Sequence, residues 1–414
     1  MSNPMKTRLG LLVAWLLLGL SAADAQEQRG GGAFEEPPLP DKALLAKIEA
    51  LPDDTWMKLP AFRTAGDVAW MNTRATSDYR RIGPSVRDYC NRMVWAADRR
   101  RALYCGAGHN IHPLNDVWEY DLASNAWICL YAPDPAPPRD SPEWYRENVV
   151  RRGDVVVTPR GGPVRPAHTW WGLCYDSDRR RLIFFDVHKG IMFTNYEQLA
   201  AAVGLKANGP ILRMYGSGPG EGWVFAFDPE ARAWDENVVT NTPKADESTE
   251  LEYLPHRKAL WLHSGKTYLM EQGAREWKPI AEQGPRSGGV SAYDAETRTI
   301  VSAGSRAFEY SCDDAEWTPG GALPEGVRGR IPHSMMCFDS VARRFVLCTT
   351  LAEGREPRRL RLFLYDLKEK AWNTPAAQGD LPTTTNFAGY YDPERNVTVV
   401  YGNREMWAYR ARRK

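Results

Sequence analysis

The chain has 414 residues, and its 53 Lys and Arg against 52 Asp and Glu give a formal net charge of +1 at pH 7. This near-zero charge gives no general reason to expect nucleic acid or an anionic membrane as a partner, although it leaves room for local basic patches. The 16 Trp, 18 Tyr, 34 Gly and 30 Pro favour many short aromatic strands joined by turns, and so an all-β repeat architecture.

Residues 1–25 have the pattern of a secretory signal peptide. Lys6 and Arg8 precede an apolar run from Leu9 to Leu20, and small residues stand at Ala23 and Ala25. The run is shorter than the roughly 20 residues that span a bilayer. We therefore expect cleavage near Ala25, a secreted or periplasmic protein, and no membrane span.

Residues 26–54 are expected to form a Gly- and Pro-rich leader or spacer, with one short helix from Ala43 to Ala50 capped by Asp41. Residues 55–414 are expected to form a single domain. The seven Cys are an odd number, so at least one thiol stays outside any intramolecular pairing. Cys337 and Cys348 either face each other across two strands or are small buried hydrophobic residues.

The first marker of an internal repeat is an aromatic-containing strand followed six residues later by Trp. Repeats with periods of about 40 to 50 residues are typical of propellers or arrays. The five copies run from Asp121 to Trp127, Asp228 to Trp234, Glu271 to Trp277, Ser311 to Trp317, and Asp366 to Trp372.

The second marker is a strand that ends in an aromatic residue and an acid, followed by a basic turn and another apolar strand. The four regular copies are Tyr175-Asp176, Tyr293-Asp294, Phe338-Asp339 and Tyr391-Asp392. Two degenerate copies, at Trp95 before Arg99 and at Leu254 before Arg257, bring the set to six.

The unequal number of markers predicts how the fold closes. The last repeat, at Trp407 to Arg410, has no following Trp, whereas an orphan Trp56 to Leu59 begins the domain. We expect this N-terminal segment to supply the outer strand of the last blade, because closure removes exposed sheet edges. The prediction is an all-β protein with six four-stranded blades. The alternative is seven blades, with the seventh formed by residues 60–85 or 133–165.

These repeats resemble the kelch family of β-propellers, which includes the central domain of galactose oxidase. The resemblance covers about residues 56–410. The glycine pair of that family is reduced to one Gly in three blades and replaced in the other three. The single glycines are Gly106, Gly304 and Gly402, and the replacements are Asp186, His263 and Thr349. The repeated Tyr, Trp and Arg are assigned to blade packing and inter-blade contacts.

Two long insertions, 133–165 and 189–221, are expected on one face beside blade two. In a four-stranded meander, the loops between second and third strands and the loops between blades emerge together. The second insertion contains a predicted helix from Tyr196 to Val203, capped by Asn195 and stopped by Gly204. Ordered loops of this length are typical of functional lids.

Six of the seven His are predicted on this same face, although His also favours loops and strand ends in general. His168 and His188 are the sharpest pair, because they stand at neighbouring strand ends near the channel mouth. The candidate catalytic residues are His168, His188, Tyr196, Arg213 and Tyr215. The candidate ligand-binding residues are Trp170, Trp171, His109, His263, Arg286, Arg330 and His333.

The preferred function is an exported propeller that binds an extracellular ligand, a carbohydrate, near blade two. One alternative is a polysaccharide lyase that uses His168 and His188. His and Tyr exchange protons and Arg neutralises a carboxylate, as in the propeller-type polysaccharide lyases that this set resembles. Further alternatives are a protein-interaction scaffold and a small-sugar isomerase resembling the exported kelch-type sialic acid mutarotase.

No metal and no cofactor are expected. His109 and His112 lie on a loop without a completing Cys or acid, and galactose oxidase takes a copper ligand from a domain after its propeller. The expected partner is a carbohydrate or other extracellular ligand, with no nucleic acid partner, and the chain is expected to be a monomer.

Overall fold

The computed structural model describes most of the chain beyond its first 33 residues. The described residues are 34–72, 83–84, 86–87, 90–106, 114–135, 142–153, 155–164, 166, 170–186, 201–204, 220–240, 242–245, 249–282, 284–285, 289–327, 334–351 and 359–413.

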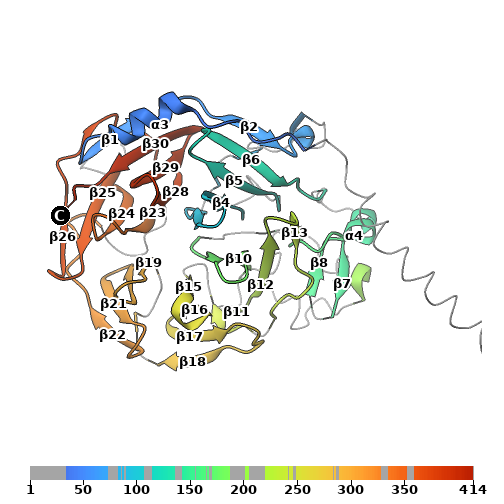
Figure 1. Cartoon of the computed structure of the whole chain (residues 1–414). Coiled ribbons are helices and arrows are strands. Elements are labelled where there is room, and N and C mark those ends of the chain that lie inside the picture. Colours follow the sequence, from blue (N-terminus) through green and yellow to red (C-terminus); the bar gives the residue numbers. More distant parts are fainter. Residues whose placement is uncertain are drawn as a thin grey trace, which may run out of the picture.

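Within these residues, six antiparallel sheets surround a central axis, so the chain is a six-bladed β-propeller (Figure 1). Blade one has β3 (Val94–Ala96), β4 (Arg101–Tyr104), β5 (Val117–Asp121) and β6 (Ala126–Tyr131); blade two has β9 (Leu173–Asp176), β10 (Arg181–Asp186), β12 (Trp223–Asp228) and β13 (Ala233–Trp234). Blade three has β15 (Glu250–Leu254), β16 (Ala259–Ser264), β17 (Lys266–Glu271) and β18 (Lys278–Ala281); blade four has β19 (Val290–Asp294), β20 (Thr299–Ala303), β21 (Ala307–Ser311) and β22 (Glu316–Pro319). Blade five has β23 (Ser334–Asp339), β24 (Arg344–Leu351), β25 (Arg359–Asp366) and β26 (Ala371–Asn373); blade six has β28 (Phe387–Asp392), β29 (Val397–Gly402) and β30 (Glu405–Arg410).

The outer strand of blade six comes from the N-terminal part of the domain, as predicted. Strand β1 (Thr55–Lys58) pairs antiparallel with β30, with Trp56 opposite Tyr409. The two rings pack with centroids 5.0 Å apart. This closure brings residues 55–58 and 405–410 into one sheet, which ties the ends of the domain together.

The Trp of the first marker packs on an aromatic ring of the preceding strand, which explains the fixed spacing. Trp127 lies on Tyr120 and Trp234 on Phe227, each pair with ring centroids 5.2 Å apart. Trp372 lies on Tyr365 at 4.8 Å. The Trp56–Tyr409 pair has the same arrangement, so one aromatic pair recurs from blade to blade and holds the outer strand in place.

The acid of the second marker caps the turn that follows it. The Asp176 carboxylate accepts hydrogen bonds from the backbone N–H groups of Asp178 and Arg179, at 3.1 and 3.0 Å. Arg180 then adopts a left-handed backbone with φ 56°. Asp339 and Asp392 cap their turns in the same way. These acids and basic residues therefore have the structural role expected for them.

The segment before β1 docks on the propeller rather than standing free as a spacer. Helix α3 (Lys42–Glu49) is capped by the Asp41 carboxylate, which accepts from the backbone N–H groups of Ala43 and Leu44. Leu44 and Ile48 are buried against the propeller core. The helix expected from the sequence is present, and its apolar side covers the outer edge of blades six and one (Figure 1).

Residues 60–85 and 133–165 do not form a seventh blade in the parts that the structure describes. Strand β2 (Arg63–Gly66) adds to blade one, parallel to β6, and is followed by the 3-10 helix η1 (Ala69–Asn72). Residues 142–157 contain helix α4 (Pro142–Asn148) and a hairpin of β7 (Val150–Arg152) and β8 (Val155–Val157). Three further elements complete the set: β11 (Gly220–Glu221) paired with β14 (Lys244–Ala245), β27 (Gln378–Gly379) parallel to β1, and the 3-10 helix η4 (Pro255–Arg257).

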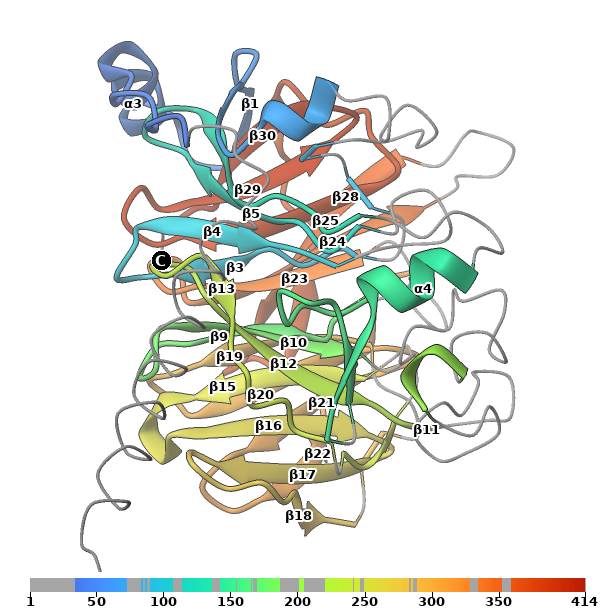
Figure 2. The same ribbon diagram turned by 90° about the vertical axis from the view of Figure 1, so that its right-hand side faces the viewer.

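The α4 and hairpin insertion is fastened to blade one by a buried carboxylate. Asp134 Oδ2 accepts hydrogen bonds from Asn115, Tyr131 and Thr158, at 2.8, 2.7 and 2.6 Å. Figure 2 shows α4 on the side of the disc opposite the turn between β3 and β4. We call the side of α4 the insertion face and the side of the turns between first and second strands the turn face.

All seven cysteines lie in the described residues, and all are buried and form no disulfide there. Cys337 and Cys348 stand on the paired strands β23 and β24, but Cys337 lies opposite Val346 and Cys348 opposite Met335. The two cysteines therefore do not face each other across the strands, and the structure supports the other interpretation, that they are small buried hydrophobic residues.

Candidate functional site

Most of the site residues predicted from the sequence lie outside the described residues. They are the five candidate catalytic residues and four of the candidate ligand-binding residues: His168, His188, Tyr196, Arg213, Tyr215, His109, Arg286, Arg330 and His333. Of the predicted helix 196–203, residues 201–203 are described as helical, and Gly204 follows with φ 66°. Trp170, Trp171 and His263 are described and are considered in turn.

Trp170 stands at the axial start of blade two and is partly exposed. Its backbone has φ 39°, a conformation that is rare for a bulky side chain. It forms a parallel bridge with Cys90, which precedes the first strand of blade one. The residue is therefore held at the boundary between two blades, on the end of the channel that belongs to the insertion face.

Trp171 points away from solvent. Its side chain is 1% exposed, and its indole N–H donates to the Ser291 carbonyl at 2.9 Å. It bridges in parallel to Glu250 at the start of blade three. Trp171 thus links blades two, three and four from within, and Trp170 is the member of this Trp pair that has an exposed surface.

His263 is a buried residue of blade three. Its ring is stacked near Trp261 and Trp317, with Nδ1 3.1 Å from Thr267 Oγ1 and Nε2 3.0 Å from the Pro285 carbonyl. Burial lowers its pKa from 6.5 to about 4. Because both ring nitrogens already have partners in the protein, His263 does not face a ligand in this arrangement, and we leave it out of the proposed site.

Arg92 crosses the axis from blade one and joins the blades near the insertion face. It forms an ion pair with Glu252 at 2.5 Å and donates to the Leu251 carbonyl at 2.6 Å. Its guanidinium lies over the Trp171 ring, 4.9 Å from the centroid. Side-chain exposure is 12% for Arg92 and 6% for Glu252, so the pair is largely shielded from water. This contact ties blade one to blades two and three.

Glu250 is a fully buried carboxyl next to this pair. One oxygen accepts from the Gly289 backbone N–H and from the Ser302 hydroxyl at 2.5 and 2.6 Å, and the other, Oε2, has no hydrogen-bond partner among the described residues. Burial, the largest cause, raises its pKa from 4.5 to about 7. Glu250 therefore exchanges its proton near neutral pH, a property that clusters at functional sites.

Sequence reasoning overlooked Arg92, Glu250 and Glu252. The alternation Glu250-Leu251-Glu252-Tyr253 is a detectable signal, because it places two acids on one side of an inner strand. Arg92 carries no such signal, since its partner is 160 residues away in sequence.

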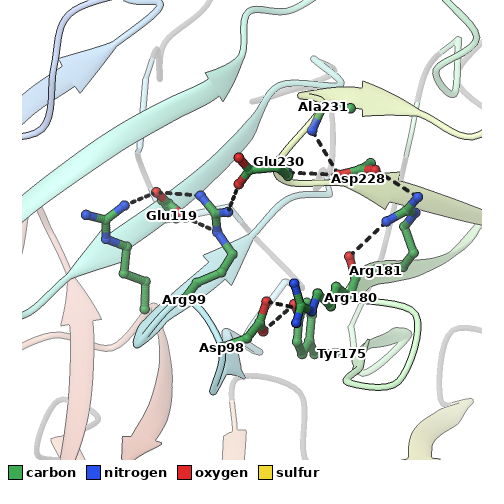
Figure 3. A network of polar contacts seen from close by, with 10 residues as sticks. Asp98, Arg99, Glu119, Tyr175, Arg180, Arg181, Asp228, Glu230 and Ala231 are labelled. Carbon is green, nitrogen blue, oxygen red and sulfur yellow. Dashed lines mark hydrogen bonds and ion pairs between the residues drawn. The ribbon is translucent and has the colours of Figure 1, made fainter.

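The turn face is held by a separate set of ion pairs between blades one and two (Figure 3). Arg99 lies between Glu119, at 2.8 Å, and Glu230, at 3.3 Å. Asp98 accepts from the Tyr175 hydroxyl at 2.6 Å. Most of these charged groups are paired with each other, so this network stabilises the blade boundary and leaves little free charge for a ligand.

Among the described residues, no group of three or more His, Cys, Asp or Glu is arranged to hold a metal ion. No helix in the same part of the chain is long and apolar enough to cross a membrane.

The comparisons with known proteins assign no family to the chain. No protein-family model matches the chain, and no curated protein matches its sequence. A chain in a crystal structure of the mitotic checkpoint complex is similar with a TM-score of 0.41 and 9% identity, over 81% of this chain and 94% of that chain. The two sequences are too different for this similarity to carry functional meaning. The class defined by the sheet topology is a six-bladed β-propeller.

Proposed function

We propose that this protein is an exported, kelch-like β-propeller that binds an extracellular carbohydrate on its insertion face, beside blade two. The signal-peptide pattern of residues 1–25 supports export. The recurring aromatic pairs and capped turns support the kelch likeness. The chain acts as a monomer.

The observation that carries this proposal is the position of Trp170. It is a partly exposed indole in a rare backbone conformation at the mouth of the channel. Backbone outliers of this kind cluster at ligand sites, where the surrounding structure holds them in place. The next residue, Trp171, is anchored by its hydrogen bond to the Ser291 carbonyl and by the guanidinium of Arg92 over its ring. A partly exposed indole on a backbone anchored in this way suits the apolar face of a sugar ring.

Glu250 favours a second candidate function, a polysaccharide lyase acting on uronic-acid glycans. In such a reaction a base takes the proton beside the carboxylate, the bond to the neighbouring sugar's oxygen breaks, that oxygen gains a proton, and a ring double bond remains. His168, His188, Tyr196, Arg213 and Tyr215 are the residues assigned to this chemistry. A proton-exchanging carboxyl at the start of blade three supports it.

The test uses purified mature protein and a panel of acidic and neutral polysaccharides. Retention in an affinity gel measures binding, and absorbance of the unsaturated uronic product measures elimination. The proposal predicts retention by at least one polysaccharide, reduced about tenfold in affinity by Trp170→Ala. Trp277→Ala, in the outer part of blade three, serves as the matched control and leaves retention unchanged.

The two functions give different results in this assay. Absorbance that disappears in a His168→Ala/His188→Ala variant establishes the lyase. Retention without absorbance establishes the binding protein. Absence of both across the panel contradicts the carbohydrate proposal and leaves the protein-interaction scaffold as the preferred function.

A further inference from the structure

The second-marker positions form a ring of aromatic side chains around the channel, one from each blade. Three of them are partly exposed and three are buried with 7 to 8% of their surface accessible. We call this ring the aromatic collar, and its members are Trp95, Tyr175, Tyr253, Tyr293, Phe338 and Tyr391. In blade three Tyr253, rather than its neighbour Leu254, occupies the aromatic position.

The collar lines a cavity of about 420 Å³ on the axis of the propeller. The residues two positions further along each strand stand in the turns, and all six are exposed, so the cavity opens at the turn face. These rim residues are Ala97, Ser177, Pro255, Ala295, Ser340 and Pro393. The volume is within the range of about 300–1,000 Å³ that is typical of small-molecule sites.

Hydrogen bonds to neighbouring blades hold three of the collar tyrosines in place. Other rings pack against part of the collar, with Tyr390 stacked on Trp95 at 6.0 Å and Phe345 against Phe338 at 4.8 Å. The Tyr175 hydroxyl donates to Asp98 at 2.6 Å, and the Tyr253 hydroxyl donates to Asp178. The Tyr293 hydroxyl lies 2.7 Å from His256 Nδ1. In each case the partner belongs to the neighbouring blade, so the hydroxyl is already satisfied outside the cavity. These three tyrosines therefore present ring surface, and no unbonded hydroxyl, to the channel.

The inner end of the cavity carries the ion pair of Arg92 and Glu252, both of which line it. This pair places hydrogen-bond donors and acceptors side by side. A net anion approaching Arg92 meets the charge of Glu252, and a net cation approaching Glu252 meets that of Arg92. A neutral group that both donates and accepts, such as a pair of adjacent hydroxyls, matches this end of the cavity.

We propose that the cavity lined by the aromatic collar is a second ligand site. It takes one neutral sugar ring, with its apolar faces against the collar and two of its hydroxyls against Arg92 and Glu252. This site does not depend on the proposed site at Trp170, which lies at the opposite end of the channel. The aromatic collar thus binds a ligand as well as stabilising the boundaries between blades.

The experiment titrates the mature protein with neutral monosaccharides, namely glucose, galactose, mannose and N-acetylglucosamine. Saturation-transfer NMR and the fluorescence of the protein detect binding. We expect at least one of these sugars to bind, and Trp95→Ala and Phe338→Ala each to weaken it about tenfold. Tyr293→Phe keeps the ring and is expected to bind as the wild type does. Thermal unfolding of each variant checks that it is folded.

Glu252→Gln provides a test of the inner end of the cavity. Removing the carboxylate leaves the charge of Arg92 unbalanced, so glucuronate is expected to gain about tenfold relative to glucose. Failure of all four sugars to bind overturns the proposal. So does binding that Trp95→Ala and Phe338→Ala leave unchanged, or binding that is lost only in Trp170→Ala, because these results place the sugar elsewhere.

Discussion

Glu250 and His263 are two buried ionisable residues whose pKa values shift in opposite directions, because burial disfavours the charged form of each. Burial keeps the Glu250 carboxyl protonated, with a pKa of about 7, and keeps the His263 imidazole neutral, with a pKa of about 4. Each shift links proton binding to the free energy of unfolding. The two residues therefore give the fold opposite dependences on pH between about 4.5 and 6.5.

Glu250 is predicted to make the protein less stable as pH rises. Its folded pKa lies above the ordinary value of 4.5, so the folded state binds the proton more tightly, and stability is lost from pH 4.5 up to about 7. At about 1.4 kcal/mol per pKa unit, the loss is about 3 kcal/mol. Glu250→Gln keeps an acceptor for Gly289 and Ser302 and removes this loss. Urea unfolding at pH 5 and pH 8 measures it, and an unchanged wild-type dependence in the variant contradicts the assignment.

His263 is predicted to make the protein less stable as pH falls. Its folded pKa lies below 6.5, so the unfolded state binds the proton more tightly, and stability is lost from pH 6.5 down to about 4. The size of the effect is also about 3 kcal/mol. His263→Asn is expected to flatten the acid side of the stability profile, whatever its effect on stability at pH 8. An acid side as steep as that of the wild type would place the titrating group elsewhere.

His263 also shows why residue roles were difficult to predict. The sequence places it at the end of a second strand, where a residue reaching the binding face is expected. The rings of Trp261 and Trp317 and the carbonyl of Pro285 enclose it instead. Pro285 comes from the connection to the next blade, and a strand pattern does not indicate how such a connection folds back.

At the scale of elements, the N-terminal helix depends on Arg410, the last residue of β30. Its guanidinium donates to the carbonyls of Ile48, Glu49 and Leu51, at 2.8, 2.9 and 2.9 Å. The same side chain reaches the Arg395 carbonyl at 3.0 Å. These bonds engage carbonyl groups at and just after the end of α3, where a helix supplies few donors of its own.

Arg410→Ala is therefore predicted to release α3 and to lower the free energy of unfolding by roughly 3 kcal/mol. Arg412→Ala is the matched control, since the Arg412 side chain is 74% exposed and forms an ion pair with Asp54; its expected cost is under about 1 kcal/mol. Denaturant unfolding gives both values, and amide exchange of residues 42–49 reports the helix. Equal costs for the two variants would show that the anchor is unimportant.

Strand β1 could be predicted from the sequence because the Trp missing from the last repeat is found at the start of the domain. Trp56 has no preceding aromatic strand, and the last repeat has no following Trp, so one completes the other. Strands β2 and β27 were not predicted, because they add to blade edges in parallel through only a few residues. Short edge pairings have no hydrophobic period of their own.

At the scale of the whole molecule, the number of blades could be predicted from the two repeated markers. Each marker reflects a contact within one blade, either a Trp packed on an aromatic ring or an acid that caps a turn. The contacts of the candidate functional site were harder to predict from the sequence. Arg92 meets Glu252 and Trp171 only after three blades have closed around the axis. Such contacts depend on closure of the ring, and no spacing within one repeat encodes them.

The two ends of the channel also differ in character. The end near the insertion face has the partly exposed Trp170, with Trp171 and Glu250 buried nearby, whereas the turn face opens into the aromatic collar. The two proposed sites therefore make separable predictions, since substitutions at Trp170 and Trp95 affect opposite ends of the axis.

The most direct measurement of the central claim is a crystal structure of the mature protein with an oligosaccharide from the polysaccharide that it retains. The account predicts density for a sugar ring against the indole of Trp170, on the insertion face beside blade two. Oligosaccharide density confined to the outer walls of the blades, with Trp170 free of ligand, would contradict it.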